Sequence, residues 1–186
     1  MKLLEKSIME APIVKKGDYN YIIHPLTDGI PKIDPDLLEE VAQKMLRFIP
    51  PDIEKIVTIE AMGIPLATAI SLKIGKPFTI IRKRQYNLPG EVSVEQVTGY
   101  SKSKLFINGL KKGDKVVIVD DVLSTGGTLR AVLKALREIG VKVENVLIAI
   151  DKGKVAEEIE NEFGVPIISI ANIEVSEGKV TINSIR

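Results

Sequence analysis

The residues best suited to chemistry in this chain form a nine-residue segment at positions 120–128, in which two carboxylates precede hydroxyls and glycines. Glycines let a backbone wrap closely around a phosphate group, and hydroxyls add hydrogen-bond donors. The carboxylates are able to accept hydrogen bonds from a ribose diol, or to orient the hydration shell of a magnesium ion. The segment therefore predicts a site for a sugar phosphate. Its residues are Asp120, Asp121, Val122, Leu123, Ser124, Thr125, Gly126, Gly127 and Thr128.

A strand before this segment and a helix after it are needed to position these groups. The continuous β-branched run at 116–119 is typical of a parallel strand covered on both faces. Apolar residues then recur at helical spacing from Leu129 to Leu136. The free N–H groups and the positive dipole end of a helix N-terminus favour a phosphate. Ligands of open α/β sheets bind at the carboxyl ends of the strands, where this segment is expected to lie.

Composition indicates one α/β domain and excludes several classes of protein. A chain of 186 residues with 45% hydrophobic residues buries one good core, so we expect a single domain over residues 1–186. The net charge of +1 gives no support for a nucleic-acid partner. The absence of cysteine excludes a disulfide framework and a thiolate metal site, and it fits a cytoplasmic location. Apolar stretches of membrane-spanning length are missing, so no membrane partner is expected.

Helices and strands alternate along the chain after an N-terminal third that we expect to be irregular. This alternation predicts a parallel sheet with helices on its faces. We expect a helix that begins at Pro35 with Asp34 as its cap, and a second helix that Gly75 closes. Further elements are strands at 56–59, 78–81 and 146–150, a helix at 155–163, and a short hairpin around 177–178.

Residues 84–104 match no single element, because they hold Pro89, Gly90, Gly99 and several charges. Long loops inside compact domains are usually functional or disordered. We interpret this stretch as a mobile lid that excludes water during a reaction. Residues 104–107 are expected to form a strand that returns from the lid.

Two acidic residues followed by Thr-Gly-Gly-Thr resemble the phosphoribosyl-pyrophosphate signature of type I phosphoribosyltransferases. Three other passages extend this resemblance to purine enzymes of the family. Residues 60–63 resemble the pyrophosphate loop, which often carries a cis peptide in the family. Residues 82–91 resemble the R-K and L-P-G-E passage of the adenine and xanthine branches, and residues 21–31 resemble the irregular hood that covers the purine there. The resemblance implies a parallel-sheet fold with a small hood, made from the N-terminal third and the C-terminal tail.

This resemblance implies transfer of ribose 5-phosphate from phosphoribosyl pyrophosphate to a purine nitrogen, with release of pyrophosphate. The site residues implied are Asp120 and Asp121 for the ribose hydroxyls or metal-bound water, Ser124, Thr125, Gly126, Gly127 and Thr128 for the 5-phosphate, and Glu60, Ala61, Met62, Gly63, Arg82 and Lys83 for the pyrophosphate. Magnesium would be bound mainly through the substrate, with no metal site built by the protein alone. A homodimer is also implied.

Lys152 is the residue that bears on which purine is used. It follows the strand at 146–150, so we expect it to face the same crevice. Its position resembles the one at which oxopurine-using relatives place a Lys on the exocyclic oxygen of the purine, whereas adenine enzymes usually do not. An ammonium only donates hydrogen bonds, which suits a 6-oxo oxygen and not a 6-amino group. We therefore favour hypoxanthine, with guanine also accepted, while the adenine-like hood keeps adenine as the alternative. Lys152 could instead be a solvated residue that opens the next helix.

The chain also departs from the family pattern. Met62 stands where adenine-specific relatives commonly carry Arg, and Arg82 and Lys83 would replace that charge. Ser124 stands where some hypoxanthine-guanine relatives place Asp, so we hypothesise that water, or a lid carboxylate such as Glu91 or Glu95, takes the proton.

A lone histidine is more often structural than catalytic, so His24 is left outside the site. A nucleotide-sensing regulator on the same fold is the alternative of another class, and it would need a nucleic-acid surface or an added DNA-binding domain.

Overall fold

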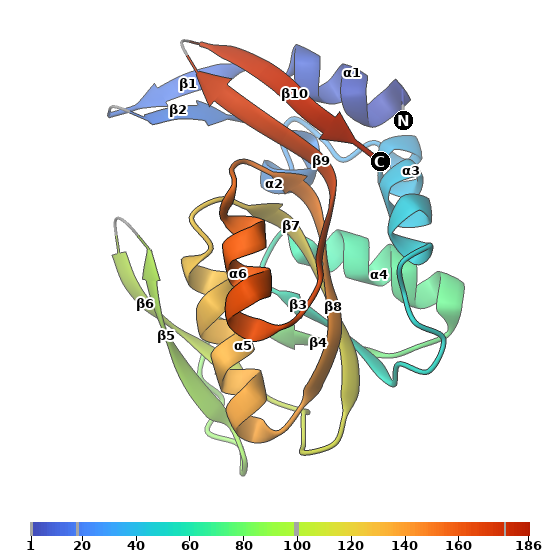
Figure 1. Cartoon of the computed structure of the whole chain (residues 1–186), viewed down its shortest axis with the longest axis vertical. Coiled ribbons are helices and arrows are strands. Elements are labelled where there is room, and N and C mark those ends of the chain that lie inside the picture. Colours follow the sequence, from blue (N-terminus) through green and yellow to red (C-terminus); the bar gives the residue numbers. More distant parts are fainter. Residues whose placement is uncertain (1, 18, 99–100, 177) are drawn as a thin grey trace.

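The computed structural model describes residues 2–17, 19–98, 101–176 and 178–186 (Figure 1). In this part of the chain, a six-stranded sheet has the order β10-β9-β8-β7-β3-β4, and β1-β2 and β5-β6 form two smaller sheets. The strands are β1 (Ile13–Lys16), β2 (Tyr19–Ile22), β3 (Lys55–Ile59), β4 (Phe78–Ile81), β5 (Val92–Thr98), β6 (Ser101–Ile107), β7 (Lys115–Leu123), β8 (Lys142–Asp151), β9 (Ile167–Ser176) and β10 (Lys179–Ile185). The helices are α1 (Lys2–Glu10), α2 (Pro25–Asp28), α3 (Pro35–Leu46), α4 (Gly63–Ile74), α5 (Gly127–Ile139) and α6 (Val155–Phe163).

The six-stranded sheet is parallel except for β10, which pairs antiparallel with β9. Strand β7 is buried on both faces, as its β-branched run predicts. Val117 and Val119 belong to the core shared with α3 and α4, whereas Val116 and Ile118 belong to the core shared with α5 and α6. The predicted α/β class with helices on both faces is confirmed.

The connections on either side of the β3–β7 pair diverge. The chain moves from β3 through α4 to β4, and from β7 through α5 to β8, in opposite directions along the sheet. Because parallel crossovers are right-handed, these two helices cover opposite faces. A crevice at the carboxyl ends of β3 and β7 is therefore expected, and open α/β sheets bind their ligands at such a switch point.

The N-terminal third is not irregular, and this expectation was wrong. It contains α1, the β1–β2 hairpin and α2. Leu4 and Ile8 of α1 are completely buried, and α1 packs against β10 while β2 contacts β9. These short elements depend on distant partners, so their local pattern is weak. We call residues 2–31 together with β10 the hood; it lies at the top of Figure 1.

The predicted lid is also more regular than expected. Strands β5 and β6 form a hairpin in which Val92 faces Ile107, and the predicted returning strand at 104–107 lies within β6. Arg82 and Phe106 exchange backbone hydrogen bonds of 3.0 and 2.7 Å, which attach the hairpin to the β4 edge of the sheet. Strand β5 of this hairpin packs against α5. Residues 99 and 100 of the predicted lid lie outside the described residues.

Several predicted boundaries are confirmed. The Asp34 side chain accepts a 3.0 Å hydrogen bond from the Asp36 N–H at the start of α3, and Gly75 and Gly164 close α4 and α6 in the left-handed conformation. The C-terminal hairpin forms where expected, but it is not short, because β9 begins at Ile167 and first pairs with β8. None of the helices in the described ranges is long and apolar enough to cross a membrane.

Candidate active site

The predicted site residues gather at one edge of the sheet. Residues 60–63 follow β3, Arg82 and Lys83 follow β4, residues 120–128 end β7 and lead into α5, and Lys152 follows β8. The strands β8, β7, β3 and β4 are consecutive neighbours in the sheet. Their carboxyl ends therefore surround the switch point from both sides.

The loop before α5 leaves polar groups open toward this edge. Gly126 has a φ of +76°, which favours glycine, and a Cβ there would lie 2.6 Å from Ile159 Cδ1 and 2.9 Å from Arg130 Nη1. Among the residues that the structure describes, the hydroxyls of Ser124 and Thr125 make no hydrogen bond. Together with the N–H groups at the start of α5, these hydroxyls can surround a phosphate.

Asp120 and Asp121 lie inside strand β7 instead of following it, which corrects the predicted end of the strand. The Asp121 N–H donates a 3.0 Å hydrogen bond to Asp120 Oδ1. Burial raises the pKa of the Asp120 carboxyl well above its usual range, and the neighbouring Asp121 raises it further. Burial also raises the pKa of the Asp121 carboxyl, although Lys152 opposes this shift. Burial and mutual repulsion therefore disfavour the ionised form of the pair, which a bound cation or a donor-rich ligand would stabilise.

The donor set fits a magnesium ion that is only partly held by the protein. Carboxylate oxygens are hard ligands of the kind that magnesium prefers. The described ranges contain no group of three or more His, Cys, Asp or Glu placed to hold a metal ion. Asp120 and Asp121 can thus supply a minority of the ligands, while water and substrate oxygens must supply the others.

Gly63 allows close contact between the start of α4 and the acid pair. A Cβ at this position would overlap Thr58 Oγ1 and lie 2.7 Å from Asp120 Oδ1. Thr58 Oγ1 is itself buried without a hydrogen-bond partner in the described structure. A buried unpaired hydroxyl costs free energy, and such groups are often found at functional sites. The Glu60–Ala61 peptide in the same loop is cis, as the resemblance implied for a pyrophosphate loop.

Arg82 and Lys83, which are expected to supply the charge of the arginine that Met62 replaces, differ in their contacts. Glu60 Oε2 accepts a 2.8 Å hydrogen bond from Arg82 Nε and a 3.0 Å hydrogen bond from the Lys83 N–H. Arg82 is therefore paired with a carboxylate, whereas the Lys83 ammonium has no carboxylate partner among the described residues. Met62 faces the hood, because a Cβ on Gly29 would lie 3.4 Å from its Cε. Lys83 is thus the better candidate for an incoming pyrophosphate.

Lys152 is held between the sheet and the hood. Its N–H donates a 2.7 Å hydrogen bond to the Leu123 carbonyl, beside the phosphate loop, and its ammonium lies 4.9 Å from the ring centroid of Tyr21. Burial lowers the pKa of this ammonium, and the charges of Asp28 and Asp121 oppose the shift. Helix α6 begins three residues later, at Val155. The reading of Lys152 as a solvated residue opening a helix was therefore wrong.

Tyr21 and Asp28 are neighbours of Lys152 that sequence reasoning did not assign to the site. Tyr21 lies on β2 and Asp28 ends α2, and both fall in the passage that resembles the hood. Their polar character within a mostly apolar stretch was the available signal. His24 is structural, as expected: it caps α2 through its 3.2 Å contact with the Leu26 N–H and lies 2.8 Å from Ser7 Oγ.

Glu91, one of the two lid carboxylates considered for proton transfer, is occupied by structural contacts. It accepts hydrogen bonds from the N–H groups of Tyr86 (3.0 Å) and Asn87 (3.1 Å), and from Asn108 Nδ2 (2.8 Å). The Asn108 contact is the main cause of a lowered pKa of the Glu91 carboxyl. A carboxylate held in this way is a poor proton acceptor, which leaves Glu95 and water.

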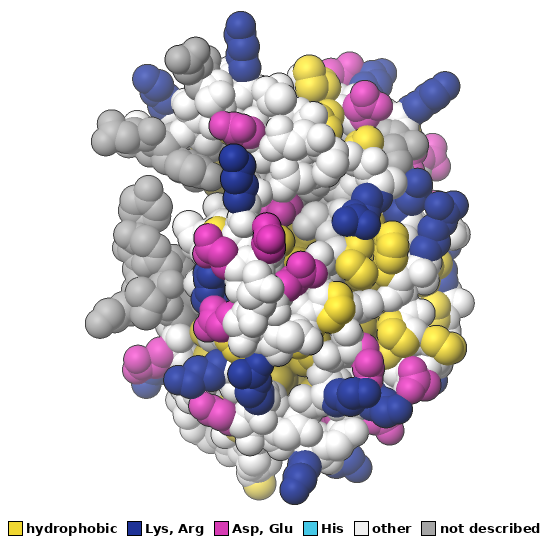
Figure 2. Space-filling view, in the orientation of Figure 1, with side chains coloured by type: hydrophobic (Ala, Val, Ile, Leu, Met, Phe, Trp, Pro, Cys, Tyr) yellow, Lys and Arg dark blue, Asp and Glu magenta, His cyan; other side chains and the backbone are white. Residues whose placement is uncertain are grey.

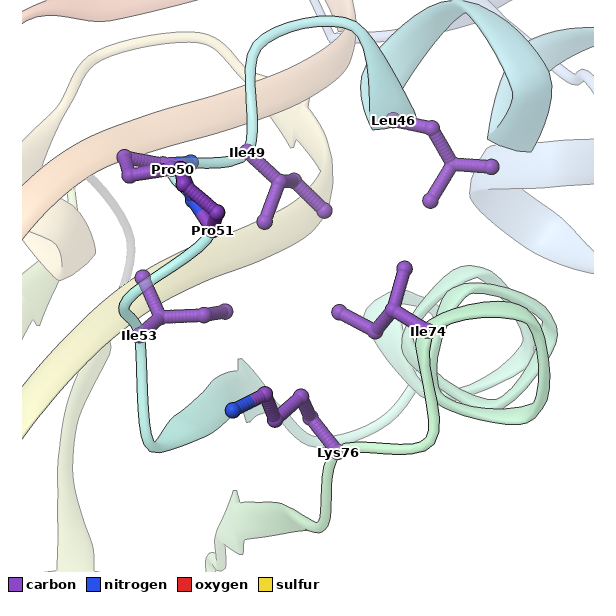
Figure 3. A pocket seen from close by; sticks show the side chains of 7 residues that line it. All are labelled: Leu46, Ile49, Pro50, Pro51, Ile53, Ile74 and Lys76. Carbon is purple, nitrogen blue, oxygen red and sulfur yellow. The ribbon is translucent and has the colours of Figure 1, made fainter.

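A separate cavity of about 230 Å³ lies away from these residues (Figure 3). It lies where α3 and α4 end and just before β3 and β4 begin, so it is at the amino edge of the sheet. Its lining is apolar apart from one lysine and offers little to a sugar phosphate. The lining residues are Leu46, Ile49, Pro50, Pro51, Ile53, Ile74 and Lys76.

A glycine-rich loop and an acid pair at the switch point of a parallel sheet are the arrangement that the resemblance to phosphoribosyltransferases implied. Residues 35–177 match the family described as Phosphoribosyl transferase domain, and the chain belongs to this family. A hypoxanthine/guanine phosphoribosyltransferase from Methanobacterium lacus is 52% identical over 183 residues, which are 98% of this chain and 96% of that protein. One from Methanobacterium paludis is 53% identical over 179 residues, which are 96% and 94% of the two chains.

Solved structures confirm the fold. The adenine phosphoribosyltransferase from Thermoanaerobacter pseudethanolicus has a TM-score of 0.72 at 23% identity, covering 91% of this chain and 99% of that one. The adenine phosphoribosyl transferase from Trypanosoma brucei, in complex with AMP, pyrophosphate and ribose-5-phosphate, has a TM-score of 0.75 at 18% identity, covering 92% and 80%. The predicted type I phosphoribosyltransferase fold is thus confirmed.

Proposed function

We propose that this chain is a purine salvage enzyme that transfers the 5-phosphoribosyl group from phosphoribosyl pyrophosphate to hypoxanthine and guanine, with release of pyrophosphate. The observation that carries the proposal is the meeting of the 120–128 segment and Lys152 at one switch point. The first offers groups for a sugar phosphate, and the second offers a buried donor for a base. The near full-length hypoxanthine/guanine relatives support the same assignment.

The protein's main task in this reaction is to position two substrates and stabilise the leaving pyrophosphate. Residues 124–128 hold the 5-phosphate, while Asp120 and Asp121 accept hydrogen bonds from the ribose hydroxyls or from metal-bound water. The loop at 60–63 and Lys83 receive the pyrophosphate. Magnesium, when bound with the substrate, supplies positive charge against the departing phosphates.

Lys152 distinguishes the proposed substrate from adenine. Its ammonium donates to the 6-oxo oxygen of hypoxanthine or guanine, whereas the 6-amino group of adenine offers it no acceptor. A site built around such a hydrogen bond rejects the mismatched base. Adenine phosphoribosyl transfer is the alternative that the test below separates.

The proposal is tested by initial rates with hypoxanthine, guanine, adenine and xanthine at one phosphoribosyl pyrophosphate concentration. We expect hypoxanthine and guanine to be used, and Lys152→Ala to lower kcat/KM for hypoxanthine by about 10²-fold, as for a lost hydrogen bond to a charged group. The exposed neighbour Lys154, changed to Ala, is the matched control. A wild-type preference for adenine, or an equal loss with both bases, would contradict the proposal.

The wider setting is also proposed. We infer a cytoplasmic homodimer that takes up magnesium with phosphoribosyl pyrophosphate and has neither a nucleic-acid nor a membrane partner. The absence of cysteine fits the reducing cytoplasm. Lys and Arg are interspersed with Asp and Glu over the face in Figure 2, where a nucleic-acid-binding regulator would favour one sign. Sedimentation equilibrium tests the homodimer, and a filter-binding assay with total nucleic acid tests the expected lack of nucleic-acid binding.

A further inference from the structure

The aromatic ring of Tyr21 contacts the cation proposed to read the base. The Lys152 ammonium lies 4.9 Å from the ring centroid, within the range in which a cation is attracted to an aromatic face. Lys152 is partly buried, so water screens this attraction less than it would at the surface. The contact joins the hood to the loop after β8.

The Tyr21 ring is itself fixed through its hydroxyl. This hydroxyl donates a 2.6 Å hydrogen bond to Asp28 Oδ1. The other oxygen, Asp28 Oδ2, accepts a 2.9 Å hydrogen bond from the His24 N–H and one of 2.6 Å from Thr27 Oγ1. Both oxygens of the carboxylate are therefore engaged, which determines where Tyr21 places its ring.

The backbone end of Lys152 is fixed independently. The Lys152 N–H donates a hydrogen bond to the Leu123 carbonyl. Asp151 and Asn172 also hold the adjoining turn. Asp151 Oδ1 accepts from the Gly153 N–H at 3.1 Å, and Asn172 Nδ2 donates to Asp151 Oδ2 at 3.0 Å and to the Gly153 carbonyl at 2.8 Å. The backbone of Lys152 and the Tyr21 ring are therefore both fixed, and only the flexible methylene chain of Lys152 lies between them.

Without the ring, other groups would compete for the ammonium. The charges of Asp28 and Asp121 both act on Lys152, from the hood and from β7 respectively. A lysine side chain has up to about 2 kcal/mol of rotamer entropy to lose when it is ordered. An ammonium free to move would spend time on these carboxylates and would be less available to a neutral purine oxygen.

We propose that Tyr21, held by Asp28, is a positioning residue that keeps the Lys152 ammonium directed at the oxygen of a 6-oxopurine and so contributes to base preference. This inference rests on the proposed function. Because the purine oxygen is present both before and after transfer, the ring should act on binding of the base more than on the chemical step. The predicted signature is a change in KM for hypoxanthine with kcat retained.

The test compares Tyr21→Leu and Tyr21→Phe with a matched control. Phe163→Leu removes an equivalent contact far from the site, where the Arg137 guanidinium lies 4.8 Å from the Phe163 ring centroid. We expect Tyr21→Leu to raise KM for hypoxanthine about tenfold, the effect of a desolvated cation–ring contact. Tyr21→Phe keeps the ring but loses the Asp28 anchor, so its increase should be smaller. Phe163→Leu should leave both KM values and kcat unchanged.

The outcomes separate this inference from the proposed function. Wild-type protein that fails to use hypoxanthine overturns the proposed function and the inference with it. Normal wild-type turnover with an unchanged KM for hypoxanthine in Tyr21→Leu overturns the inference alone. Equal increases in KM for hypoxanthine and for phosphoribosyl pyrophosphate also overturn it, because they indicate general damage. If Tyr21→Leu does not fold, Tyr21→Phe replaces it in the test, because that variant preserves the ring and its packing. A smaller rise in KM for hypoxanthine then supports the inference, and an unchanged KM overturns it.

Discussion

The 120–128 segment and the hood serve the same crevice but are constructed in opposite ways. The segment is continuous in sequence. Among the described residues, the hydroxyls of Ser124 and Thr125 make no hydrogen bond, and burial disfavours the ionised form of the acid pair. The hood combines α1, β2, α2 and β10, and the polar groups around Asp28 bond to one another. Under the proposed function, open hydroxyls would bind the phosphate, whereas side chains whose positions are already fixed would select the flat base. Neutralising the acid pair should therefore leave stability equal or raise it, whereas changes to the polar groups of the hood should lower it.

The largest expected effect concerns the acid pair. Conversion of Asp120 and Asp121 to Asn should lower phosphoribosyl-pyrophosphate-dependent turnover on the order of 10²–10³-fold, as when electrostatic stabilisation is removed from an active site. The melting temperature should stay equal or rise, because a raised pKa means that the ionised pair destabilises the fold near neutral pH. Activity assays and calorimetry on the double variant check both expectations.

Asp114 provides the matched control for the acid pair. It is also buried, but it accepts 2.8 Å and 3.1 Å hydrogen bonds from Lys55 Nζ and the Lys111 N–H. These contacts lower the pKa of its carboxyl against the effect of burial, so its charge stabilises the fold. Asp114→Asn should cost about 1–3 kcal/mol of stability and leave turnover unchanged. Wild-type turnover in the Asp120 and Asp121 double variant would remove both residues from the site.

The next effect concerns the hood and depends on pH. The pKa of His24 is lowered from 6.5 to about 4, mainly by burial and also by the charge of Lys152, while the charge of Asp28 opposes both. Between these values the unfolded chain binds a proton that the folded protein does not, so the free energy of unfolding falls as the pH drops from 6.5 to 4. The expected loss is about 3 kcal/mol.

His24→Asn isolates this contribution, because Asn can still cap α2 but does not titrate. Urea unfolding at several pH values should show a steeper acid loss for the wild type than for the variant. Identical slopes would mean that the imidazole does not remain neutral in the hood.

The smallest effect tests whether the phosphate loop depends on backbone shape. Gly126→Ala combines a positive φ with a Cβ only 2.6 Å from Ile159 Cδ1, whereas Gly164→Ala has a similar φ of +67° and open space. Both should cost about 1–2 kcal/mol for the left-handed conformation. Gly126→Ala should lose more, and only this variant should raise KM for phosphoribosyl pyrophosphate. Equal behaviour of the two variants would argue against a precisely shaped loop.

Sequence reasoning was most successful where a contact is local. The β-branched run of β7, the Asp34 cap and the Gly164 terminus each follow from neighbouring residues, and all are present. Strand β5 was missed although Val92 and Val94 alternate with polar residues, because charges and glycines nearby obscured the strand pattern. The hood could not be predicted in detail, because α1 packs against β10 and β2 against β9, both more than a hundred residues away.

The candidate site also contains residues that a local pattern predicts and residues that only the fold brings together. The acid pair and the phosphate loop are contiguous, so their spacing alone indicates a phosphate. The pairing of Glu60 with Arg82 and the contact of Tyr21 with Lys152 depend on how separate strands end at one edge. Such relations become visible only when the sheet order is known.

The packing of α1 against β10 has a consequence for synthesis on the ribosome. Residues 179–185 leave the ribosome long after residues 2–10, so Leu4 and Ile8 must wait for the strand that helps to bury them. The phosphate-binding half of the crevice has all its strands available earlier. We expect the nascent chain to acquire its sugar-phosphate half first, and to complete the half that selects the base only when its last strand emerges.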